Sequence, residues 1–148
     1  MPMPAVVAPA PWPEGITTQD GAPVRLAQLA GKNVLLYFYP KDDTPGCTIE
    51  ACNFRDHREE YVNTVIYGAS LDDAASHKAF RAKFNLPYDL LVDTPERALA
   101  KAFGALPEGA QYTSRTSVLI GVDGKIKAIW PKVDAKVHYQ EVRTAIGG

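Results

Sequence analysis

The sequence predicts an α/β fold in which a mixed β-sheet carries helices on both faces. Along most of the chain, short apolar runs alternate with helix-forming stretches, which is typical of strand–helix–strand units with parallel strands. Asp123 and Gly124 lie between two further apolar runs and indicate an antiparallel hairpin with a type I′ turn. A last helix-forming stretch follows, so we expect one sheet with both parallel and antiparallel strands.

The strands are expected where apolar, aromatic and β-branched residues run together. Residues 33–39 follow a turn at Gly31 and are halted by Pro40, as is typical of a buried strand. Residues 64–71 form a second run of this kind. Shorter strands are expected at 90–92, 117–122 and 125–130. Near the N-terminus, Asp20 and Gly21 indicate a small hairpin.

The helices are expected between and after these strands. The first is a helix of about four turns, with Thr44 as its N-cap and Pro45 at its first position, and it contains no Gly or Pro over residues 47–62. The other helices are expected at 74–84, 96–103 and about 135–146. Cys47 therefore falls in the first turn of the first helix.

The composition fits a single domain over residues 1–148. A chain of 148 residues can bury roughly 70% of its unfolded surface. Its formal net charge is -1 and it has no long basic cluster, so no nucleic acid partner is expected. No apolar run approaches the length of about 20 residues that spans a membrane, so no membrane association is expected either.

The N-terminal residues, about 1–13, read MPMPAVVAPAPWP and contain no Lys or Arg. They fit a secretory signal poorly, because such a signal has a basic start and an unbroken apolar stretch. We expect an extended arm of polyproline type. Without an export signal the expected compartment is the cytoplasm, where lasting structural disulfides are rare and close cysteines more often serve redox or metal chemistry.

Cys47 and Cys52 are the two cysteines of the chain and lie five positions apart. A cysteine attacks as its thiolate, which first-turn amides and the helix dipole favour at Cys47. On an intact helix, residues five apart have Cα atoms about 8.6 Å apart, whereas a disulfide needs less than about 7 Å. The pair is therefore poorly placed for a structural disulfide, and a disulfide between the two cysteines requires the first turns of the helix to unwind.

Helical phase separates the two sulfurs. Cys47 shares a stripe with Ala51, Phe54 and Tyr61 on the expected core side, whereas Cys52 lies on another face. For Cys52 alone, the role of a small buried apolar residue stays open, and Thr44 could serve only as a helix cap. The chain lacks CxxC, and its three histidines are scattered, so no metal site is expected.

Residues 38–52, FYPKDDTPGCTIEAC, resemble the active-site segment of peroxiredoxins, in particular the peroxiredoxin Q or bacterioferritin comigratory protein group. The PxxxTxxC pattern of that family is matched at Pro40, Thr44 and Cys47. Further similar segments lie at residues 70–80, 86–96 and 115–126. The resemblance covers most of the chain and implies a thioredoxin-like fold.

The resemblance also implies a role for each matching residue. Cys47 corresponds to the peroxidatic cysteine, Thr44 to the hydroxyl that bonds sulfur and peroxide, and Pro40 to the residue that shields the pocket. Arg115 corresponds to the arginine that stabilises the thiolate and orients the peroxide; without the resemblance it would be a solvated charge at a strand entry. Cys52 corresponds to the resolving cysteine.

The implied activity is reduction of hydrogen peroxide and organic hydroperoxides without a bound cofactor, as antioxidant defence. Cys47 becomes a sulfenic acid, condenses with Cys52 into an intrachain disulfide, and is recycled by thioredoxin or glutaredoxin. Glu50 corresponds to an acidic residue that supports the hydrogen-bond network. Since the disulfide closes within one chain, a monomer is expected. A thiol–disulfide exchange enzyme and a non-enzymatic redox sensor are the alternatives.

Overall fold

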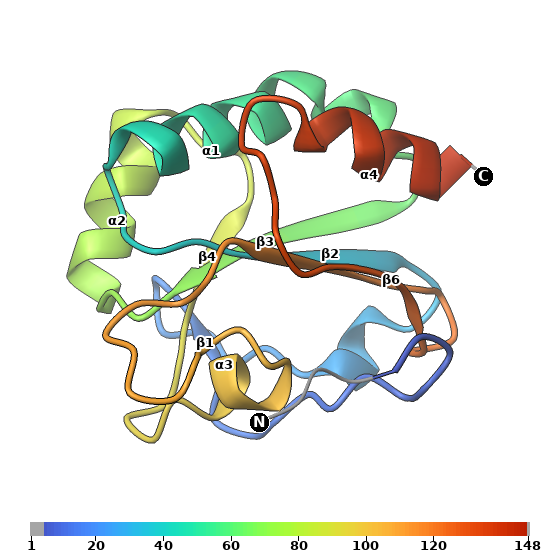
Figure 1. Ribbon diagram of the computed structural model, residues 1–148, viewed down its shortest axis with the longest axis horizontal. Coiled ribbons are helices and arrows are strands. Elements are labelled where there is room, and N and C mark those ends of the chain that lie inside the picture. The colour runs from blue at the N-terminus through green and yellow to red at the C-terminus, as the bar shows by residue number, and fades with distance from the viewer. Residues whose placement is uncertain (1–4, 148) are drawn as a thin grey trace.

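The computed structural model describes residues 5–147, whose strands form one six-stranded sheet in the order β1-β4-β3-β2-β5-β6 (Figure 1). The strands are β1 (Thr17–Thr18), β2 (Asn33–Phe38), β3 (Thr64–Ser70), β4 (Asp89–Val92), β5 (Thr116–Ile120) and β6 (Ile126–Trp130). The helices are α1 (Pro45–His57), α2 (Ala74–Lys83), α3 (Ala98–Ala102) and α4 (His138–Gly147), with 3-10 turns η1 (Leu26–Leu29) and η2 (Arg58–Glu60).

The sheet is mixed, as the sequence predicts. Strands β2, β3 and β4 are parallel neighbours, whereas β5 runs antiparallel to β2, β6 to β5, and β1 to β4. Helices α1, α2 and α4 cover one face of the sheet, and α3 and η1 cover the other (Figure 1). The expected α/β arrangement with helices on both faces is therefore confirmed.

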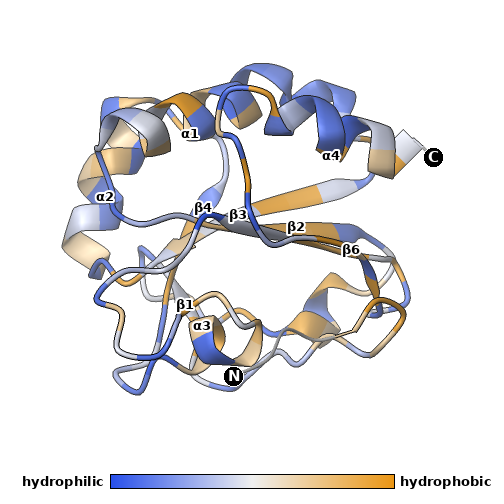
Figure 2. Ribbon diagram, in the orientation of Figure 1, coloured by the Kyte–Doolittle hydropathy of each residue, from blue (hydrophilic) through white to orange (hydrophobic). Residues whose placement is uncertain are grey.

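The core consists of two apolar layers, one on each side of the sheet. Successive residues of a strand point to opposite faces, so β2 sends Leu36 and Phe38 to the α3 side and Leu35 and Tyr37 to the α1 side. Figure 2 shows the apolar colour concentrated in the central strands. Burying a side chain of this size contributes about 1.5–3 kcal/mol to the free energy of unfolding. Because β2 contributes such side chains to both layers, it stabilises both.

Helix α1 begins where the sequence predicts and ends earlier. Thr44 is the N-cap and Pro45 the first helical residue. The regular helix ends at His57 and tightens into η2, instead of continuing to residue 62. The chain must turn there to enter β3, and it does so through Asn63, which has a φ of 52° and whose carbonyl accepts from the amide of Asn33.

Two other helices begin later than expected. Helix α3 was expected from residue 96, but Arg97 has a φ of 62°, and the Asp93 carboxylate accepts from the second and third amides of the helix, those of Leu99 and Ala100. Helix α4 was expected from about residue 135. There, Asp134 accepts hydrogen bonds from three of the next four amides and forms a turn that delays the helix to His138.

The predicted β5–β6 hairpin is present, but its turn type is not the expected I′. A type I′ turn needs positive φ at both central residues, and Gly124 has a φ of 79° whereas Asp123 is not among the described residues with positive φ. The Gly124 amide donates to Gly121 O at 3.0 Å, and the Gly121 amide donates to Lys125 O at 2.8 Å. This is a turn followed by a glycine bulge.

The N-terminal region also differs in part from its prediction. The small hairpin is confirmed: Gly21 has a φ of 83°, and the Thr18 amide donates to Ala22 O at 2.8 Å. The described part of the arm, residues 5–13, is not a free polyproline segment; residues 1–4 lie outside the described part. Val7 donates its amide proton to Ile126 O at 2.8 Å, so the arm lies along β6.

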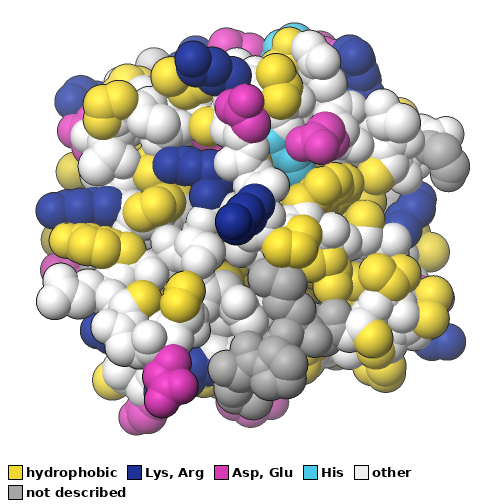
Figure 3. Space-filling model, viewed as in Figure 1, with side chains coloured by type: hydrophobic (Ala, Val, Ile, Leu, Met, Phe, Trp, Pro, Cys, Tyr) yellow, Lys and Arg dark blue, Asp and Glu magenta, His cyan; other side chains and the backbone are white. Residues whose placement is uncertain are grey.

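The outer surface carries charges of both signs. On the face that Figure 3 shows, Lys and Arg side chains alternate with Asp and Glu side chains and with apolar ones. Over residues 5–147, no helix combines the length and the hydropathy needed to cross a membrane.

Candidate active site

The sheet order brings Cys47 and Arg115 together. Helix α1 follows β2 after the loop of residues 40–44, so Cys47 lies just beyond the carboxyl end of β2. Strand β5 is antiparallel to β2, and Thr116 pairs with Phe38 at that same end. Arg115 immediately precedes this pair, which places its long side chain over the start of α1.

The sulfur of Cys47 is buried and contacts a cation. Cys47 is 1% exposed, and Arg115 Nη2 donates to its Sγ at 3.4 Å. Arg115 Nη1 donates to Glu50 Oε1 at 3.0 Å. Burial alone would lower the pKa of Arg115, but its contacts with Cys47 and Glu50 outweigh burial and raise the pKa. The guanidinium therefore keeps its charge against the sulfur.

Gly46 makes room for this contact. A Cβ built on Gly46 would lie 3.0 Å from Arg115 Nη2, closer than such atoms normally approach. The guanidinium therefore lies directly against the backbone of the first helical turn. Any side chain at this position would have to displace it.

Glu50 is a buried carboxyl on the other side of Arg115. Burial raises the pKa of Glu50 from 4.5 to about 7, while the charge and hydrogen bond of Arg115 oppose this change in part. Its Oε2 atom is buried without a hydrogen-bond partner among the described residues. A proton on this carboxyl is therefore easily held near neutral pH.

Thr44 is the N-cap, but its hydroxyl does not cap the helix. It donates to Lys41 O at 2.9 Å, within its own loop. Over residues 5–147, the amides of Gly46 and Cys47 are consequently left without a protein acceptor. They form an open pair of donors at the positive end of the helix.

A buried network that sequence reasoning missed holds the loop between β2 and α1. The Asp42 carboxylate accepts from the Tyr39 hydroxyl at 2.5 Å and the Ser76 hydroxyl at 2.8 Å, and lies 2.7 Å from His77 Nδ1. His77 Nε2 in turn lies 2.9 Å from Leu91 O. In the sequence the three histidines are scattered, and no local pattern predicts that His77 contacts Asp42, which lies 35 positions earlier.

The same network explains a cluster with metal-binding residue types. Ligand atoms of Asp42, Asp72 and His77 lie within 4.8 Å of one another. These atoms already take part in hydrogen bonds, since Ser70 donates to Asp72 at 2.5 Å and Asp72 accepts from the Asp42 amide at 2.8 Å. The cluster is thus satisfied by protein groups.

Cys52 lies in the same intact helix as Cys47, and both thiols are free. The predicted phase is confirmed, because Ala51 and Phe54 are buried with Cys47 whereas Cys52 is partly exposed. Burial raises the pKa of Cys52, with the nearby Arg55 opposing it. The cation that contacts the sulfur of Cys47 is Arg115. Pro40 is half-buried and lies two residues after the end of β2, in the loop that leads to the site.

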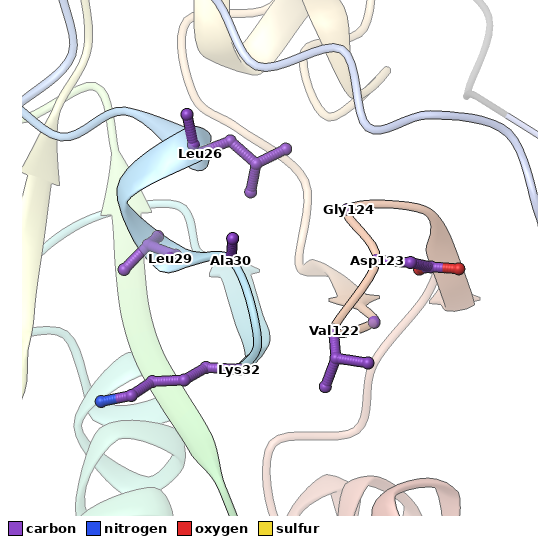
Figure 4. A pocket seen from close by; sticks show the side chains of 9 residues that line it. Leu26, Leu29, Ala30, Lys32, Val122, Asp123 and Gly124 are labelled. Atoms are coloured by element: carbon purple, nitrogen blue, oxygen red, sulfur yellow. The ribbon is translucent and has the colours of Figure 1, made fainter.

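The protein also has an apolar groove far from these thiols. It has a volume of about 360 Å³ and lies between η1 and the β5–β6 turn, toward which the Leu26 side chain points (Figure 4). Because η1 covers the face of the sheet opposite α1, this groove is separate from the Cys47 site.

Comparison with known proteins gives consistent similarities. The family model described as the AhpC/TSA family matches residues 3–129. Peroxiredoxin Bcp of Bacillus subtilis is 43% identical, over 82% of this chain and 82% of that protein. Peroxidoxin BcpB of Mycobacterium tuberculosis superimposes with a TM-score of 0.84 at 30% identity, over 99% of this chain and 97% of that one.

A second similar structure is that of a protein with alkyl peroxide reduction activity. Bacterioferritin comigratory protein of Xanthomonas campestris was solved as trapped intermediate and ligand complexes bearing on its alkyl peroxide reduction activity. It superimposes with a TM-score of 0.83 at 31% identity, over 89% of this chain and 88% of that one.

Proposed function

Because the chain belongs to the AhpC/TSA family, in its peroxiredoxin Q or bacterioferritin comigratory protein group, we propose a role for each residue around Cys47 in peroxide reduction. The protein is a thiol-dependent peroxidase, and its fold is the thioredoxin-like fold that the resemblance implied. This family membership favours the peroxidase over the exchange enzyme and the redox sensor.

Cys47 is the attacking thiolate. Its sulfur forms a bond to one peroxide oxygen while the O–O bond breaks, and the electron pair leaves with the other oxygen. That oxygen takes up a proton and departs as water or an alcohol. Cys47 is oxidised by two electrons to the sulfenic acid, and the hydroperoxide is reduced by the same two electrons.

Arg115 supplies the main electrostatic stabilisation. The observation that carries the proposal is the 3.4 Å contact from Arg115 Nη2 to the buried Cys47 Sγ. A cation fixed in a half-buried site stabilises both the thiolate and the negative charge that develops on the oxygens. Glu50 holds the other end of the guanidinium and so keeps it in register with the sulfur.

The remaining donors bind the peroxide. The open amides of Gly46 and Cys47 lie at the start of α1, where a substrate oxygen can accept from them. The Thr44 hydroxyl joins them by rotating away from Lys41 O when substrate enters. Pro40 limits the access of water to the sulfur.

Cys52 resolves the oxidised thiol. Its sulfur attacks the sulfenic acid of Cys47, an S–S bond forms, the S–O bond breaks, and the oxygen leaves as water. The first turns of α1 unwind to let the sulfurs meet. The dithiol of thioredoxin, or of glutaredoxin, then reduces the disulfide and becomes oxidised itself. The protein acts in the cytoplasm.

Peroxide turnover with a thioredoxin, thioredoxin reductase and NADPH system tests these roles. Cys47→Ser is expected to lose activity by at least about three orders of magnitude, because a serine hydroxyl cannot take up the oxygen and Arg115 contacts Cys47 rather than Cys52. Cys52→Ser is the matched control, since it keeps the first attack and loses only turnover with thioredoxin. Full activity in Cys47→Ser would exclude Cys47 as the attacking residue.

A further inference from the structure

Two buried tyrosines contact helix α1 between its cysteines. The Tyr88 hydroxyl donates to Ala51 O at 2.9 Å. The Tyr37 hydroxyl lies 2.7 Å from the Tyr88 hydroxyl. Because Tyr88 has one hydroxyl proton and gives it to Ala51, Tyr37 is the donor in the second bond. A hydrogen-bond chain therefore runs from Tyr37 through Tyr88 to the helix backbone.

Packing alone does not account for these hydroxyls. Phenylalanines would fill nearly the same volume and would need no partner in the core. Space is also provided for them, since a Cβ on Gly68 would lie 2.9 Å from the Tyr37 hydroxyl. In an α-helix the Ala51 carbonyl also accepts from the Arg55 amide. The Tyr88 hydroxyl therefore donates to the second lone pair of the Ala51 oxygen.

The second half of α1 is tied to the rest of the protein beyond this point. Asn53 Nδ2 donates to Ala135 O at 3.2 Å, and Arg55 Nη1 donates to Phe84 O at 2.7 Å. The Phe54 ring is fully buried, with its centroid 4.8 Å from that of Tyr37.

The first half of α1 has few such ties. Among the described residues, the only side chains of residues 45–50 with a hydrogen bond to another element are Cys47 and Glu50, and both bonds come from Arg115. The helix is thus divided at Ala51, with the attacking thiol in the loosely held half.

We infer that Tyr88, oriented by Tyr37, is the positioning residue at which the unwinding of α1 stops when the Cys47–Cys52 disulfide forms. This inference rests on the disulfide proposed above. The hydrogen bond from Tyr88 holds the Ala51 carbonyl in its helical position, and the part of α1 that stays helical begins at this residue. Cys52 then remains in place beside it, and Cys47 leaves Arg115 and moves to Cys52. The second half of α1 stays docked and is ready to refold the first half after reduction.

Hydrogen exchange followed by mass spectrometry, before and after one equivalent of hydrogen peroxide, tests where the unwinding stops. In the oxidised wild type, amides of residues 49–54 lose their acceptors and exchange fast, whereas amides of residues 55–57 stay protected. In oxidised Tyr88→Phe, residues 55–57 are expected to exchange about tenfold faster, the factor that one lost hydrogen bond gives. In the reduced forms, where the whole of α1 is helical, a smaller difference is expected.

Tyr61→Phe is the matched control, because the Tyr61 hydroxyl donates to Tyr139 O at 2.8 Å and not to α1. It should leave unchanged the boundary between the fast-exchanging amides of residues 49–54 and the protected amides of residues 55–57. Fast exchange of residues 55–57 in the oxidised wild type would overturn the inference, even without any variant. An unchanged boundary in Tyr88→Phe would also overturn it.

Intact mass of the same samples separates this inference from the proposed function. If the oxidised wild type has lost two hydrogens and the boundary lies elsewhere, the role of Tyr88 is wrong and the disulfide stands. If no hydrogens are lost, the disulfide is wrong, and the role of Tyr88 falls with it.

Discussion

Gly46 is the residue that sets how closely Arg115 can approach the start of α1. Its missing Cβ would lie 3.0 Å from Arg115 Nη2, and the same guanidinium donates to Cys47 Sγ. The sequence shows a glycine in the TPGC stretch, but it does not show that the arginine just before β5 packs on it. That contact arises between residues far apart in the chain.

Gly46→Ala is expected to slow the reaction of the thiol with hydrogen peroxide by roughly ten- to a hundredfold. The new methyl group displaces the guanidinium by a few tenths of an ångström or more, and such misplacement weakens transition-state stabilisation. Stopped-flow measurement of the second-order rate constant checks this. Gly147→Ala is the control, because its Cβ would meet no atom within 4 Å. Equal rates for the two variants would contradict the role of Gly46.

Glu50 is the carboxyl whose charge is expected to affect stability near neutral pH. Burial raises its pKa from 4.5 to about 7, so the folded state holds its proton more tightly than the unfolded state does. Its stabilising contribution is complete below about pH 4.5 and is lost as the pH rises through about 7.

Glu50→Gln removes this titration and keeps an oxygen that can accept from Arg115. Relative to the variant, the wild type is expected to lose on the order of 2 kcal/mol of unfolding free energy from pH 4.5 to 7. Urea denaturation at fixed ionic strength measures the difference at each pH. Parallel pH profiles of the two proteins would show that Glu50 does not titrate there.

At the scale of elements, the sequence predicts starts that are set by local signals. Thr44 and Pro45 mark the beginning of α1 correctly, because both act on the first helical turn. The end of α1 and the start of α3 were not predicted, since α1 tightens into η2 at Arg58 and the left-handed Arg97 delays α3. Arg97 does not carry the usual glycine signal.

The loop between β2 and α1 shows the same limit. Its partners, Ser76 and His77, belong to α2 and reach Asp42 only because β3 packs beside β2. A carboxylate in a loop usually indicates a solvated turn, whereas here it is 6% exposed. Predicting its network requires the packing of α2, which the periodicity of one chain does not specify.

For the whole molecule, the alternation of elements predicts a mixed sheet, but it does not predict the strand order. The order places β5 beside β2, and this brings Arg115 to Cys47. From the residues alone Arg115 would be a solvated charge; the family resemblance singled it out. Candidate residues could thus be selected from the sequence, whereas the Thr44–Lys41 contact and the Asp42 network required coordinates.

We expect the molecule to be a monomer in both redox states. Cys47 and Cys52 lie on one helix, so their disulfide needs no second chain. Sedimentation velocity of the reduced and peroxide-treated protein is expected to give the mass of one 16.1 kDa chain in both cases. A dimer in either state would contradict this expectation.

The identity of the attacking thiol can be read from intact mass after one equivalent of hydrogen peroxide. In Cys52→Ser, one oxygen is expected on Cys47, mapped by a sulfenic acid reagent and peptide sequencing. The wild type is expected to lose two hydrogens, and Cys47→Ser to stay unmodified over the same time. Oxidation of Cys52 in Cys47→Ser at the wild-type rate, with Cys47 unmodified in Cys52→Ser, would show that the assignment of the two thiols is wrong.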